Sequence, residues 1–129
     1  MRLRRRFPPF DDLRRRASEA AEELYGALPP ALGERARAVP LVFEGTPGAD
    51  LVGSGVAPET LGLFIGSPFA EEPAGHPLPS EILLFLENLW VSAGGEDAAF
   101  REEVRRTLLH ELGHYLGLDE EGLTARDLD

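Results

Sequence analysis

The sequence contains no cysteine, and this absence limits the metal sites and crosslinks that the chain can form. Disulfides, iron–sulfur clusters and thiolate zinc sites are all excluded, because each of them needs cysteine sulfur. A bound metal would therefore have to be held by nitrogen and oxygen ligands.

Long apolar runs are also absent. No apolar segment approaches the roughly 18 to 20 residues that span a bilayer, so we expect no membrane partner. The first residues, Met1 to Arg6, are basic like the start of a signal peptide, but Pro8 and Pro9 follow where an apolar segment would be needed. These features predict a cytoplasmic protein.

Basic residues are scarce outside the N-terminal segment. The formal net charge is −10, from 13 basic and 23 acidic residues, and the arginines cluster within residues 1–16. The rest of the chain is therefore strongly acidic, and an acidic surface repels phosphate backbones. We expect no nucleic-acid partner.

The length and composition are those of one globular domain spanning residues 1–129. The chain is 43% hydrophobic and 28% charged, and it shows no internal repeat. A domain of this size buries about two-thirds of its unfolded surface, so it can form a core without crosslinks.

Apolar periodicity predicts a helix near each end of the chain. Over residues 10–27, apolar side chains recur at spacings of three and four, with Asp11 or Asp12 as the expected N-cap and Pro29 as the stop. A second helix is predicted from residue 97 to about residue 116, because its apolar positions form one stripe. These positions are Phe100, Val104, Leu108, Leu112 and Tyr115.

Three short apolar runs between these helices predict strands. Gly- and Pro-rich segments separate the runs, and one short helical turn precedes them. The predicted strands are residues 41–43, 61–65 and 82–86, the helical turn is 31–38, the long loop is 66–79 and a turn covers 92–95. The order of helix, strands and helix predicts an α+β fold with a small mixed sheet of about three strands.

The C-terminal helix carries a His-Glu-x-x-His pattern. His110 and His114 lie four residues apart, so both imidazoles leave one face of the helix and can reach one Zn²⁺ at about 2.0–2.1 Å. Glu111 is rotated about a quarter turn from them, where it can hydrogen-bond a water on the metal. Such a set combines a Lewis acid, an acidified water and a general base. It predicts His110 and His114 as metal ligands and Glu111 as the catalytic base.

The pattern continues as His110-Glu111-x-x-His114-x-x-Gly117-x-x-Glu120, which resembles the zincins and their metzincin-type extension. In that family the glycine lets the chain turn sharply, so that a residue three positions later returns to the metal. The resemblance implies that Glu120 is the third ligand, at the position where His or Asp is usual.

Nearly the whole chain resembles the small bacterial zincin-like metallopeptidases. These proteins have an N-terminal helix, a few strands and a His-Glu-x-x-His motif close to the C-terminus, followed by an acidic pair. The resemblance implies a minimal zincin-like fold with a C-terminal active-site helix, and zinc-dependent hydrolysis of a peptide or protein substrate.

Two features depart from the larger zincins and leave the third ligand open. The only methionine is Met1, so the methionine turn beneath a metzincin site is absent, and only 15 residues follow His114, which leaves no later helix to supply a ligand. The third ligand is therefore local or comes from the upstream loop. The candidates are Asp119, Glu120, Glu121 and His76.

Two other functions are compatible with the sequence. One is a metal-binding or protein-interaction module that keeps the zincin scaffold without catalysis. The other is a metal-dependent ribonuclease, whose motif has a third His where Glu120 stands here, although the acidic chain disfavours it. In zincins an edge strand pairs with extended substrate, and the sequence does not decide between residues 61–65 and 82–86 for this role.

Overall fold

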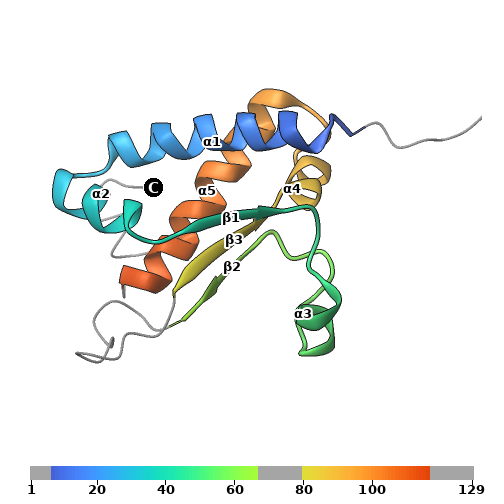
Figure 1. Cartoon of the computed structure of the whole chain (residues 1–129). Coiled ribbons are helices and arrows are strands. Elements are labelled where there is room, and N and C mark those ends of the chain that lie inside the picture. Colours follow the sequence, from blue (N-terminus) through green and yellow to red (C-terminus); the bar gives the residue numbers. More distant parts are fainter. Residues whose placement is uncertain (1–6, 67–79, 117–129) are drawn as a thin grey trace, which may run out of the picture.

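A computed structural model of the chain describes residues 7–66 and 80–116. The described elements confirm the predicted α+β fold, with a helix before and a helix after a small mixed sheet (Figure 1). In chain order the elements are α1 (Phe10–Ala27), α2 (Pro30–Arg37), β1 (Leu41–Glu44), α3 (Ala49–Gly53), β2 (Gly62–Ile65), β3 (Glu81–Phe85), α4 (Leu86–Ser92) and α5 (Asp97–Leu116).

The three strands pair in the order β1-β3-β2. β1 runs parallel to β3, with Val42 opposite Leu83, and β2 runs antiparallel to β3, with Leu63 opposite the same leucine. β3 is therefore the central strand and β2 an edge strand. Of the two runs that could pair with substrate, residues 61–65 are the one at a sheet edge.

The core lies between the sheet and the two long helices, which cover the same side of it (Figure 1). Side chains alternate along β3, so Ile82 and Leu84 point into this core. From the helices, Leu13 of α1 and Phe100 and Leu108 of α5 belong to the same buried cluster and are almost fully buried. Both helices are thus fixed by apolar packing.

The predicted extent of α1 is confirmed, but its predicted N-cap is wrong. The helix begins after Pro9, and no side chain caps it. The carbonyl oxygen of Pro9 accepts hydrogen bonds from the backbone N–H groups of Asp12 and Leu13, at 2.9 and 3.1 Å. The carboxylate of Asp12 instead accepts hydrogen bonds from Arg16 and Arg15, which lower its pKa. Asp12 therefore pairs with arginines of its own helix and does not cap the N-terminus of that helix.

Two short helices were not predicted. α4 begins at Leu86, the residue assigned to the end of the strand over 82–86, so the strand is shorter and a helix follows at once. Leu86 and Leu89, three residues apart, are the buried positions of this helix. α3 has no buried residue, and hence no apolar pattern that could have revealed it. The helical turn predicted over 31–38 is α2, displaced by one residue.

A row of ion pairs joins the exposed sides of α1 and α5. The pairs are Arg16–Asp97 (3.1 Å), Arg101–Glu19 (2.9 Å) and Arg105–Glu23 (2.7 Å). Each exposed pair contributes little alone, so the row adds modestly to the apolar packing between the two helices. The hydrogen bond from Arg101 lowers the pKa of Glu19. The stabilisation from the Glu19–Arg101 pair is therefore present above the ordinary pKa of glutamate, and it is lost as the pH falls through the lowered pKa of Glu19.

None of the described helices combines the length and the apolar character needed to cross a bilayer.

Candidate metal centre

α5 carries the candidate site, and a cap at its start and a buried apolar stripe hold this helix in place. It starts after a turn in which Gly94 and Gly95 take positive φ angles of 71° and 75°, as expected for the predicted turn over 92–95. The carboxylate of Glu96 accepts a hydrogen bond from the backbone N–H of Ala99 at 2.9 Å, which caps the helix. All five predicted apolar positions of the helix are buried.

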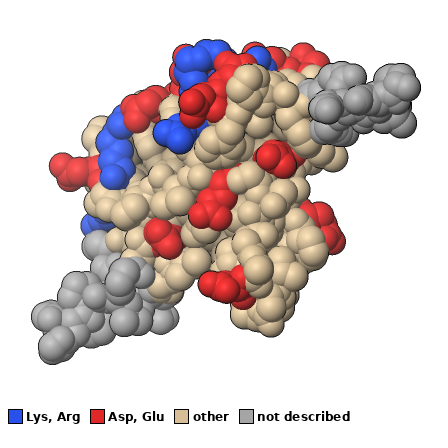
Figure 2. All heavy atoms as spheres, turned by 45° about the vertical axis from the view of Figure 1, so that its right-hand side comes forward, with Lys and Arg blue, Asp and Glu red and all other residues tan. Residues whose placement is uncertain are grey.

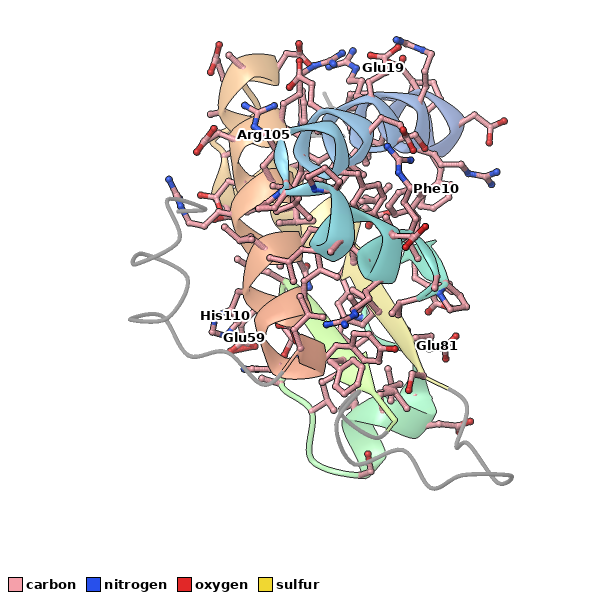
Figure 3. The ribbon with its side chains drawn as sticks, turned by 90° about the vertical axis from the view of Figure 1, so that its left-hand side faces the viewer. Phe10, Glu19, Glu59, Glu81, Arg105 and His110 are labelled. Atoms are coloured by element: carbon pink, nitrogen blue, oxygen red, sulfur yellow. The ribbon has the colours of Figure 1, made fainter. Side chains whose placement is uncertain are left out.

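His110, Glu111 and His114 come together on the C-terminal half of α5. One candidate ligand atom from each lies within 4.8 Å of the others. The two imidazole rings are 4.6 Å apart between centroids and inclined by 65°. Nδ1 of His114 lies 3.3 Å from Oε1 of Glu111. Figure 3 shows His110 on the lower half of α5 and Arg105 on its upper half, where α1 with Glu19 crosses.

The three side chains differ in exposure. The imidazoles are at the surface, and that of His114 is 54% exposed, whereas the carboxylate side chain of Glu111 is only 9% exposed. Glu111 and Thr107 are the buried polar or charged residues among those that the structure describes. They lie one helical turn apart on the same face of α5. The site therefore has an open, imidazole-bearing rim and a sheltered carboxylate.

A groove of about 380 Å³ runs between α5 and β2 at this site. Its lining residues are Leu61, Gly62, Glu103, Arg106, Thr107, His110 and Glu111. The edge strand thus forms one wall of the groove, and the helix with the His-Glu-x-x-His motif forms the other. Ring packing also holds β2 against α5, because the ring centroids of Phe64 and Tyr115 lie 5.7 Å apart.

Gly62 and Thr107 also line this groove, and neither residue was predicted from the sequence. A Cβ atom at Gly62 would lie 2.6 Å from Cγ2 of Thr107 and 3.1 Å from Cδ2 of Leu84. Only glycine therefore lets β2 approach α5 this closely. A glycine inside a predicted strand is itself a sign of close backbone approach, and it was the available signal.

Replacing Gly62 by Ala should lower the free energy of unfolding by about 1–3 kcal/mol, because the new methyl group overlaps the Thr107 side chain. Thermal or urea denaturation measures the change. Gly53→Ala is the matched control, since a Cβ there meets no atom within 4 Å. Equal stability of the Gly62→Ala variant and the wild type would show that β2 does not rest tightly on α5.

The structure brings together three of the predicted site residues. His110, Glu111 and His114 form the one group within residues 7–66 and 80–116 whose donor atoms could together hold a metal ion. Two imidazole nitrogens suit zinc and similar divalent ions, and the carboxylate beside them can hydrogen-bond a water on the ion, so the residues fit the metal that the motif implies. The candidate third ligands lie outside the described residues. These are Glu120, Asp119, Glu121 and His76.

Comparison with known proteins identifies the family. No curated protein matches the chain. The model of the zincin-like metallopeptidase family matches residues 36–129, a stretch that includes all three strands and the whole of α5. The His-Glu-x-x-His group and the groove beside it lie inside the matched stretch. The chain therefore belongs to the zincin-like metallopeptidase family.

Proposed function

We propose that the chain is a zinc-dependent metallopeptidase that hydrolyses peptide bonds, with His110 and His114 as metal ligands and Glu111 as the general base. One observation carries the proposal. The two surface imidazoles and the sheltered carboxylate lie within 4.8 Å of one another, beside a groove whose other wall is an edge strand.

Zinc held by the two imidazoles would supply Lewis acidity and would lower the pKa of water in the site from its bulk value towards about 7. Glu111 would accept a proton from the attacking water while the water oxygen adds to the carbonyl carbon of the scissile bond. The carboxyl group would then give a proton to the amine that leaves when the C–N bond breaks. Its low exposure suits this role, because bulk water competes little for a buried carboxylate.

β2 would hold the substrate in this reaction. It pairs with β3 on one side, and no other strand within the described residues pairs with its other side. An extended peptide can add to such an edge through backbone hydrogen bonds. Gly62 and His110 line the same groove, so a peptide on β2 would pass the site.

A digest of a mixed peptide library beside an RNA digest tests the proposed reaction. Zinc-loaded protein should cleave peptides, a chelator should abolish this cleavage, and the RNA should stay intact. Peptides left intact by a folded, zinc-loaded protein would instead favour a metal-binding or interaction module without catalysis. Chelator-sensitive cleavage of the RNA would indicate a metal-dependent ribonuclease.

Glu120 is the third ligand that we propose, from its place three residues after Gly117 in the motif. Zinc affinity should be compared in single alanine variants at Glu120, Asp119, Glu121 and His76. Loss of the true ligand should weaken binding by orders of magnitude, whereas loss of an outer partner costs about 10- to 100-fold. If Glu120→Ala binds zinc like the wild type while His76→Ala does not, the upstream loop closes the site and the assignment is wrong.

A further inference from the structure

β2 leads from the candidate metal centre to a second groove. This groove, of about 390 Å³, lies between the sheet and α3, and we name it the α3 groove. Its charged and larger apolar lining residues are Glu44, Asp50, Leu51, Ile65, Glu81 and Leu83. Gly62 lines the first groove and Ile65 the second, so the grooves are three strand residues apart, roughly 10 Å.

The two grooves open on opposite faces of the sheet. Side chains alternate along β2, so Phe64 packs into the core, whereas Ile65 lies on the outer face, paired in register with Glu81. A peptide paired with the free edge of β2 has the same alternation. Every second side chain of such a peptide would therefore turn towards the outer face of the sheet, where Ile65 lines the α3 groove.

The charges around the α3 groove are of one sign. The sequence has no Lys or Arg from residue 38 to residue 100. Figure 2 shows arginines along the upper and left margins of the face in view, whereas the charged side chains over its centre and lower right are acidic. Within the described residues, the carboxylates of Glu44, Asp50 and Glu81 have no ion-pair partner. A cationic side chain entering the groove would meet an uncompensated negative field.

The groove also offers apolar surface beside these carboxylates. Leu51, Leu83 and Ile65 line it, and Ile65 is 36% exposed. The side chain of arginine or lysine has an apolar stem and a charged head, which can lie on apolar surface while the head reaches acidic groups. Apolar lining with acidic side chains around it therefore matches a long basic side chain better than a short or acidic one.

We propose that β2 docks extended peptide segments that place an arginine or lysine side chain in the α3 groove, about three residues from the bond that lies at His110. This inference rests on the proposed peptidase function and adds a substrate class to it. Charge complementarity favours a basic polypeptide as the occupant of the α3 groove, because the unpaired carboxylates of the groove would repel an acidic one.

Peptide binding to the Glu111→Gln protein tests the inference separately from catalysis. A fluorescently labelled peptide of ten residues carries two arginines, each at the third residue from the centre of the peptide. Its binding is compared with that of the same peptide carrying citrulline, the neutral analogue, in place of arginine. Anisotropy should show about 5- to 10-fold tighter binding of the arginine peptide at low salt. The difference should shrink as ionic strength rises.

Two further substitutions in the Glu111→Gln protein locate the effect. Asp50→Asn with Glu81→Gln should abolish the preference for arginine. Asp11→Asn with Glu34→Gln removes the same charge from α1 and α2 and should keep the preference, since neither residue lines the groove. Equal affinity for both peptides, or no binding of either peptide, would overturn the inference. An arginine preference that survives Asp50→Asn with Glu81→Gln would also overturn it.

Cleavage by the wild-type protein separates this inference from the proposed function. If the arginine preference is found in binding but the zinc-loaded wild type cleaves neither peptide, the docking inference stands and the peptidase proposal fails. If the wild type cleaves both peptides with equal kcat/KM, the peptidase proposal stands and the basic preference is wrong.

Discussion

Glu111→Gln protein should retain its zinc and lose about 10²-fold or more of its peptide hydrolysis. Glutamine keeps the size and the burial of the side chain but cannot accept a proton from the attacking water. The loss should appear in kcat with KM nearly unchanged, because the substitution removes an interaction made mainly in the transition state. Steady-state kinetics on the zinc-loaded variant, beside its metal content, gives both quantities.

The metal content decides how a loss of activity is interpreted. The carboxylate of Glu111 lies within the same 4.8 Å as the imidazole nitrogens, so distance alone would also allow it to bind the metal. Glu102→Gln is the control, since Glu102 is on the same helix but does not line the groove. Full activity of Glu111→Gln would remove the general base from the account. Loss of zinc in that variant would make Glu111 a ligand.

His110→Ala and His114→Ala should each weaken zinc binding by orders of magnitude, more than the about 10- to 100-fold cost of losing an outer partner. Each substitution removes one of the two imidazole ligands that a single helical face supplies. Both side chains are exposed and lie outside the apolar core, so both variants should still fold. Titration against a chromophoric chelator measures affinity, and a thermal melt by circular dichroism checks folding.

A control in the same groove makes this comparison specific. Arg106 lines the groove one turn before His110 but offers no metal-ligand atom. Arg106→Gln should therefore bind zinc within a few-fold of the wild type. Wild-type affinity in either histidine variant would contradict the assignment of that imidazole as a ligand.

The sequence predicted the elements whose signals are local and strong. The extent of α5 was predicted correctly, because its apolar stripe follows the helical period and the glycine-containing turn over 92–95 precedes it. α4 was missed, since no glycine or proline separates Phe85 from Leu86 and a continuous apolar run does not show where a strand becomes a helix. α3 was missed because its five residues bury nothing.

The same distinction applies to the site. His110, Glu111 and His114 span about one helical turn, so their juxtaposition follows from the helix geometry alone. The contact between Gly62 and Thr107 depends on how β2 packs against α5, and no local pattern encodes it. The choice of edge strand needed the pairing order of the sheet. The assignment of Glu120 lies outside the described residues and stays a prediction.

The zinc content of the wild-type protein tests the central claim most directly. The protein is loaded with excess zinc, desalted, and analysed for metal and protein concentration in the same sample. We expect about one equivalent of zinc per chain, because the described residues form one group of donor atoms close enough to share an ion. A folded wild-type protein that emerges from the desalting column free of metal would contradict it.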